Sequence, residues 1–237
     1  MAGPQLSSFT KAQARDIVRG DLGLRSNNLL VDSDLDRWMG TAQGDAARVT
    51  GWYQKDDQSI ATSANQMLYD LPTDLLSIRA LRYKLLPLRL VTVEEMDRIW
   101  WNWRQQGSGT PLYWFRRGMT SFGLFPAPSA SGTTDLKMDY VAVPANPATD
   151  TDHYVIPTVL EEMLTSYAKY MASMKDSSGE GARRIDYYRK EWEQGLSDLM
   201  NLVRDTAEKE RIVMGADGEN LNGAFYDPII YATIPSS

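Results

Sequence analysis

The sequence predicts a mainly helical α+β protein, in which N- and C-terminal helices form a bundle and bracket a β-rich insertion. Apolar residues recur at helical spacing in the first 65 residues and again from Pro157 to Val203, whereas they often alternate with polar residues in between. The 237 residues are 43% hydrophobic and 24% charged, which is typical of globular proteins. We therefore expect N-terminal helices over residues 1–65, a β-rich insertion with one short helix over 66–143, a long helical hairpin over 144–214 and an extended tail over 215–237.

Two helices are predicted before residue 66. Thr10 and Gln13 have the spacing of a capping box, and the first helix ends near Gly20 and Gly23. The second helix follows Asp32 and runs for about five turns. Its apolar residues recur at steps of three and four and share one face: Leu35, Trp38, Met39, Ala42, Ala46, Val49 and Tyr53.

The insertion is expected to form a hairpin or small sheet. From Gln66 the apolar period changes to two, and Pro72 interrupts the pattern once. A short helix is capped by Thr92 and Glu95, and Gly118 marks the turn of a hairpin. The predicted strands cover residues 67–69, 76–85, 112–117, 119–125 and 136–143.

The helical hairpin begins at Pro157, a residue favoured in the first helical turn, and turns near Gly179. Each of its helices carries one apolar stripe, so the two stripes can face each other. The first stripe contains Leu160, Met163, Leu164, Tyr167, Met171 and Met174, and the second contains Ile185, Tyr188, Trp192, Leu196, Leu199 and Val203.

The helical pattern ends at Met214. A stretch rich in glycine and asparagine then leads to an apolar and aromatic segment that is costly to expose and too short to form its own core. This segment either packs on its own domain or docks on a neighbour, and we favour the neighbour because aromatic-rich extended ends suit strand addition. The residues expected to bind the partner are Phe225, Tyr226, Ile229, Ile230 and Tyr231.

Three alternating aspartates at residues 32, 34 and 36 resemble the start of a calcium loop. The match fails because Arg37 stands where the sharp-turn glycine belongs and Gln43 where the bidentate glutamate belongs. We interpret Asp32 and Ser33 instead as residues that cap the second helix.

The side-chain inventory disfavours catalysis. The chain has no cysteine and one histidine, so thiolate zinc sites, cysteine nucleophiles and histidine metal clusters are excluded. Asp150, Asp152 and His153 lie in a predicted loop, where consecutive residues rarely converge on one point. A virion enzyme that uses paired carboxylates stays open, but no pair stands out among 31 acidic residues. We predict no enzyme activity, no cofactor and no metal.

The N-terminus shows no secretion signal, and no apolar run is long enough to span a membrane, so we expect a soluble, unexported chain that binds no membrane.

Charge is uneven along the chain. The formal net charge is −6, yet residues 79–117 contain eight basic and three acidic residues. These basic residues are interleaved with tryptophans, so a nucleic-acid-binding module is the alternative function. We favour packing plus a subunit interface, because tryptophan and arginine are enriched at interface centres. The residues expected at this interface are Trp101, Trp114, Arg116 and Arg117.

The order of several short motifs resembles the head-to-tail adaptor, or connector, proteins of tailed bacteriophages. The similarity runs from about Thr10 to Val203, and the joint order of the motifs carries it. They are Asp34-Leu35 to Ala42, Tyr69-Asp70-Leu71-Pro72-Thr73-Asp74, Pro111-Leu112-Tyr113-Trp114, Leu124-Phe125-Pro126-Ala127-Pro128, Asp139-Tyr140 to Pro144, Ile156-Pro157 and Tyr167-Ala168.

The resemblance implies a structural virion protein of the neck between capsid and tail, assembled in the host cytoplasm. Such proteins form dodecameric rings beneath the portal and offer a docking surface for the tail. The implied partners are the portal protein, tail or neck proteins, further copies of the chain, and genomic DNA that passes through the ring without specific binding.

Overall fold

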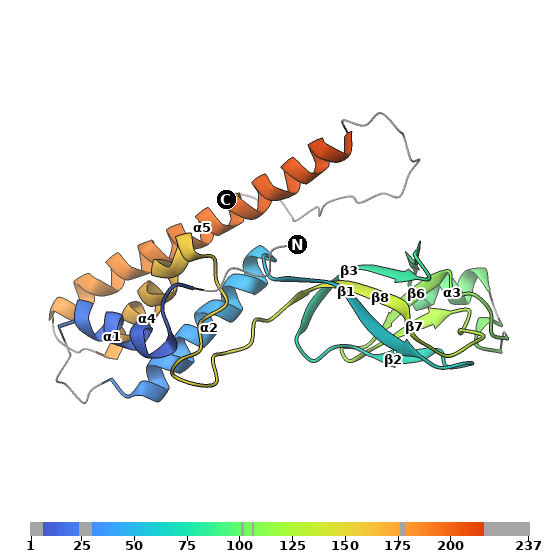
Figure 1. Ribbon diagram of the computed structural model, residues 1–237, viewed down its shortest axis with the longest axis horizontal. Helices are drawn as coiled ribbons and strands as arrows, with labels where there is room; N and C mark the ends of the chain where they lie inside the picture. The colour runs from blue at the N-terminus through green and yellow to red at the C-terminus, as the bar shows by residue number, and fades with distance from the viewer. Residues whose placement is uncertain (1–6, 24–29, 101, 106, 176–178, 216–237) are drawn as a thin grey trace.

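The computed structural model describes residues 7–23, 30–100, 102–105, 107–175 and 179–215. The fold is α+β, as predicted. Figure 1 shows an elongated molecule with a helical body at one end, a β-rich part at the other, and one long helix that projects from the body. The described α-helices are α1 (Lys11–Asp21), α2 (Asp32–Thr50), α3 (Val93–Ile99), α4 (Glu161–Lys175) and α5 (Gly179–Gly215), with 3-10 turns η1 (Trp103–Gln105) and η2 (Thr158–Leu160).

The helical body has one core, to which α1, α2, α4 and α5 all contribute. The capping box of α1 is confirmed, since the Thr10 hydroxyl accepts a bond from the Gln13 backbone and the Gln13 side chain accepts one from Thr10. The cap predicted for α2 is wrong. Its N-cap is Val31, which makes no side-chain bond, because Asp32 already lies inside the first turn.

Helices α4 and α5 pack closely along the predicted stripes. Trp192 and Leu199 of α5 are buried, and the rings of Trp192 and Tyr167 lie 5.0 Å apart. A Cβ atom at Gly195 would lie 2.6 Å from Met163 Cγ, so a glycine at this position permits the close approach. The core contacts of α5 extend to Val203, beyond which the helix continues to Gly215.

The β-rich part contains two four-stranded sheets, with strand orders β1-β8-β3-β4 and β2-β7-β6-β5. The described strands are β1 (Gln54–Thr62), β2 (Leu68–Asp70), β3 (Leu75–Tyr83), β4 (Leu86–Pro87), β5 (Arg89–Leu90), β6 (Tyr113–Arg117), β7 (Ser121–Phe125) and β8 (Gly132–Ala142). Neighbouring strands are antiparallel except β5 and β6. Side chains of both sheets share one core, so the sheets form a sandwich.

The short helix covers the outer face of the second sheet. Met96 of α3 and Trp103 of η1 pack against Phe115 and Phe125 in a separate cluster. Thr92 and Glu95 form the predicted capping box. The β-rich part is therefore three layers deep, rather than the hairpin or small sheet that we expected.

Three strand predictions need correction. Strand β1 lies before residue 66, and it was missed because its sequence is largely polar and its central residues are exposed. Strand β8 begins four residues before the predicted start, at Gly132. In β3 a register shift between Ile78 and Ala80 interrupts the alternation, so that Leu81 and Tyr83 reach the sandwich core.

Candidate interaction surfaces

The loop around the single histidine has a structural role. His153 Nδ1 lies 2.8 Å from the Ser7 carbonyl oxygen, and His153 also pairs with Thr10 as an isolated β-bridge. Asp152 accepts bonds from the backbone N–H groups of Ala148 and Thr149, and these bonds, with Thr149 the larger contributor, lower the pKa of its carboxyl group. These contacts fix the segment that leads from the sandwich back to the helical body.

The aspartates of the apparent calcium loop form ion pairs between helices. Asp36 bonds Arg15 of α1 at 2.7 Å, and Asp34 pairs with Lys175 of α4 at 2.5 Å. Asp32 pairs with Arg19, whose bond lowers the pKa of that carboxyl group. No group of three or more metal-ligating side chains occurs among the described residues. The aspartates therefore join α2 to its neighbours.

Arg15 is the centre of this ionic network. It is only 8% exposed, and besides Asp36 it pairs with Asp150 at 2.9 Å. Lys11 adds a second cation 3.2 Å from Asp36. Asp150, considered above as a candidate site residue, is thus part of the contact between α1 and the loop before α4.

The aromatic residues of the basic segment mostly pack on one another. The Trp100 ring lies 5.1 Å from Tyr113, and the Trp103 ring lies 5.2 Å from Phe115. Trp114, which we assigned to a subunit interface, is 8% exposed and belongs to the sandwich core. Its burial corrects that assignment, because the indole of this subunit faces its own core. Trp101 lies outside the described residues.

Several cations of the basic segment are already paired. Arg82 bonds Asp57 and Asp139, and Arg104 bonds Asp97 and covers the Trp103 ring. A single-stranded nucleic-acid platform needs exposed rings and available cations. These contacts therefore disfavour the nucleic-acid alternative. Arg116 and Arg117 are exposed at the end of β6 and keep their place as candidate interface residues.

A surface that the sequence did not reveal lies where the chain crosses between the two sheets. Strand β4 is an edge strand of the first sheet and β5 an edge strand of the second. Leu85, Leu86 and Leu90 are 89%, 53% and 56% exposed, and we call these three residues the leucine edge. Leu88 between them is buried in the sandwich core. The leucines around Pro87 were the sequence feature that could have indicated this edge, but we interpreted Leu85 as part of a continuing strand.

The turn before β4 exposes the first residue of the leucine edge. Tyr83 pairs with Leu86, so Lys84 and Leu85 form a two-residue turn with φ values of 48° and 69°. Asparagine and glycine are the residues that usually occupy such a turn, because positive φ is unfavourable for bulkier side chains. Leu85, which we predicted as a strand residue, is therefore held outward at the tip of a strained turn.

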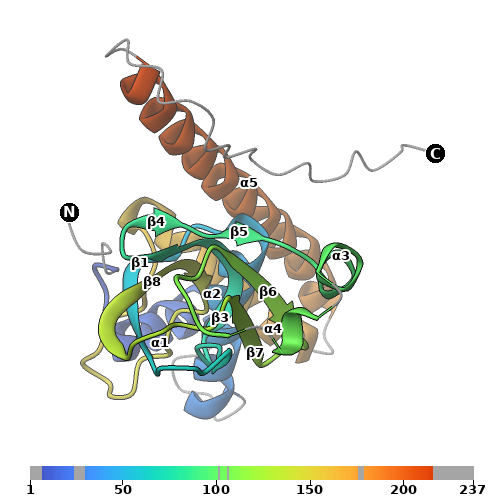
Figure 2. The same cartoon turned by 90° about the vertical axis from the view of Figure 1, so that its right-hand side faces the viewer.

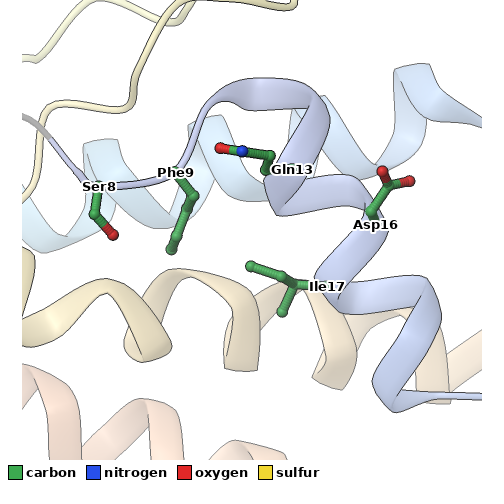
Figure 3. Close-up of a pocket in the computed structure, with 5 residues that line it drawn as sticks. All are labelled: Ser8, Phe9, Gln13, Asp16 and Ile17. Atoms are coloured by element: carbon green, nitrogen blue, oxygen red, sulfur yellow. The ribbon is translucent and has the colours of Figure 1, made fainter.

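A second surface feature is an open hollow beside the start of α1, lined by Ser8, Phe9, Gln13, Asp16 and Ile17. In Figure 3, Phe9 and Ile17 point toward the helix below them, whereas the Asp16 carboxylate points away. The Ser8 hydroxyl donates to Glu161 Oε2 at 2.7 Å and the Asp16 carboxylate points elsewhere, so the lining does not bring a nucleophile and a base together.

The proposed partner-binding residues Phe225, Tyr226, Ile229, Ile230 and Tyr231 lie outside the described part of the chain. Over the part that is described, no helix is both long and apolar enough to cross a membrane.

The charged and aromatic residues singled out in the sequence thus serve mainly to hold the described fold together. The helical body and the sandwich each have their own core, and a notable feature of the described surface is an exposed apolar edge.

The model of one protein family, described as SU10 adaptor protein, matches residues 6–215, and the chain therefore belongs to this family of phage head-to-tail adaptors. No curated protein matches the chain.

Family membership confirms the resemblance drawn from the motifs. The chain is therefore a structural adaptor protein of a phage. Membership of the family also implies a place in the virion neck, contact with portal and tail proteins, and self-assembly.

Proposed function

We propose that the protein forms a dodecameric ring beneath the portal, joins the capsid to the tail and leaves a channel for DNA. The family match carries this proposal, because it spans the helical body and the sandwich together. In this proposal the helical body is the bundle of the adaptor, and the sandwich is its insertion.

The ring lets genomic DNA pass without specific binding. The net charge of −6 supports this, since phosphate contacts by clustered cations would create affinity that must be broken during ejection. We assign acidic faces to the lumen and place assembly in the host cytoplasm.

The C-terminal segment from Phe225 to Tyr231 anchors the adaptor on the portal or on an adjacent subunit. Its apolar side chains and the absence of lysine or arginine after Arg211 support a role in burial rather than in DNA contact. Arg116 and Arg117 contribute to contacts between subunits, because they are exposed on the part of β6 that extends beyond the sandwich core.

The protein works without catalysis. The single histidine bonds a backbone carbonyl, and the lining of the hollow lacks a base and nucleophile pair. A His153→Ala variant should fold and assemble like the natural protein. Loss of a defined chemical activity in that variant, with assembly intact, would contradict the non-enzymatic role.

The function can be tested by removing the gene product from an infection. Filled heads and free tails should accumulate separately, and adding the purified protein to the extract should restore joined particles. If normal tailed virions form without it, the protein is not the adaptor.

A further inference from the structure

The leucine edge has the properties of a docking site. It combines three exposed leucines within six residues, a strained turn that holds the first of them outward, and the edge strands of two sheets. Strain of this kind persists when the surrounding structure holds it, and it is common at binding sites. No described strand pairs with the outer side of β4 or β5.

We propose that the leucine edge receives the C-terminal segment, residues 225–231, of an adjacent copy of the same chain. This inference rests on the proposed ring, and it assigns the contact by which one subunit engages the next.

The backbone of the edge can accept a short extended segment. The backbone N–H groups of Arg89 and Val91 donate hydrogen bonds to the carbonyls of Leu112, just before β6, and of Trp114 in β6. Because successive backbone groups of a strand alternate in direction, the N–H and C=O of Leu90 between them point to the unpaired side. Pro87 has no N–H, so the pairing surface is short. Pro228 of the C-terminal segment likewise lacks an N–H, which favours two short pairing stretches over one continuous strand.

The two surfaces are complementary in chemistry. The segment supplies aromatic and β-branched side chains, which favour extended structure and can cover exposed leucines. Residues 216–237 contain three acidic residues and no lysine or arginine. Arg89 is exposed beside the leucine edge, whereas the exposed Lys84 within it already pairs with Asp135 at 3.6 Å. The charge of Arg89 therefore favours approach of the segment to this edge.

The described end of α5 lies on the side of the molecule that carries the leucine edge. Figure 1 shows the C-terminal end of α5 rising away from the helical body, and Figure 2, where β4 and β5 are labelled, shows it on their side of the sandwich. The nine residues between Gly215 and Phe225 can span about 30 Å when extended.

A surface that binds a different surface of an identical chain gives a heterologous contact, which closes into a ring when the rotation between copies allows it. This is the reason for assigning the segment to an adjacent copy.

The chain has no cysteine, so disulfide trapping can test the contact directly. One full-length variant carries Leu86→Cys and a second, differently tagged variant carries Ile229→Cys. The two are mixed under conditions of assembly and oxidised gently. The control replaces Leu86→Cys with Met119→Cys, an exposed apolar position on the β6–β7 turn. We expect at least tenfold more mixed disulfide dimer from the Leu86 pair than from the control pair. Equal yields would overturn the proposal.

A single chain that carries both Leu86→Cys and Ile229→Cys identifies the source of the segment. Cross-links between chains support the proposal. Cross-links confined within one chain overturn it, because the segment would then dock on its own sandwich. If trapping fails while the adaptor still restores head and tail joining, the inference is wrong and the proposed function stands.

Discussion

At the scale of single residues, charged side chains of the helical body hold its parts together. Arg15 is nearly buried between carboxylates of α2 and of the loop before α4. The sequence showed the acidic cluster but not its partners, because ion pairs between distant residues depend on how the helices pack. The core positions of Leu35 and Trp38, by contrast, could be predicted, because the spacing of apolar residues along a helix is a local property of the sequence.

Replacing Arg15 should destabilise the body. Arg15→Ala leaves Asp36 partly buried without its bidentate partner, and we expect a loss of about 3 kcal/mol in the free energy of unfolding. Urea denaturation measures this loss. Arg48→Ala removes an exposed pair with Asp45 and should change stability by less than about 1 kcal/mol. Similar losses in the two variants would contradict a central role for Arg15.

Acid should weaken the same contacts. Hydrogen bonds from Arg19 and Lys175 lower the pKa of Asp32 and Asp34 below the ordinary value of 3.8. The unfolded chain therefore binds protons at higher pH than the folded chain does. The stabilisation is complete above the ordinary pKa and is lost as pH falls through the folded values.

Urea midpoints measured between pH 7 and pH 2.5 should stay nearly level down to about pH 5 and then fall. Asp34→Asn should show a shallower fall. An unchanged slope in that variant would show that Asp34 does not contribute to it.

At the scale of elements, local signals located most helices and failed at the sheet edges. Thr10 and Thr92 each start a helix with the predicted capping box. Strand β1 has few apolar residues, and its place in the sheet comes from pairing with β8, seventy or more residues away. The sequence did not indicate the leucine edge. Leu85 continues the alternation of apolar and polar residues along β3, whereas in the structure the chain turns at Lys84.

Gly123 is required where β7 passes the ring of Phe115. A Cβ atom at Gly123 would lie 2.1 Å from Phe115 Cζ, and that ring is buried. We expect Gly123→Ala to cost about 2 kcal/mol and to lower Tm by about 4–8 °C. Circular dichroism melting measures the change. Gly107→Ala, with no atom within 4 Å of its Cβ, is the control. Equal melting of the two variants would show that the sandwich absorbs the added methyl group.

At the scale of the whole molecule, stability and assembly are assigned to different parts of the chain. The described cores account for folding, whereas we propose that the leucine edge and the C-terminal segment bind partners. The motif order predicted the family from sequence because it extends over both parts of the fold. The sequence did not predict that the two sheets pack face to face as a sandwich, because this packing depends on contacts between segments that are distant in the chain.

Removing residues 215–237 should separate folding from assembly. Among the side chains that the structure describes, the last core contact of α5 is made by Val203, so the truncated chain should keep its helical signal and melting temperature by circular dichroism. Its incorporation into capsids should fail, because the segment that docks on a partner is gone. Normal incorporation, or collapse of the truncated body, would show that the segment packs on its own domain instead.

The most direct measurement is negative-stain microscopy of the purified protein, alone and mixed with its portal. Alone at micromolar concentration, we expect monomers or a concentration-dependent mixture, because the helical stripes are already used in internal packing. With the portal present, we predict a twelve-subunit ring seated on the portal around an open channel. Absence of added density on the portal, under conditions in which heads and tails join, would contradict the adaptor function.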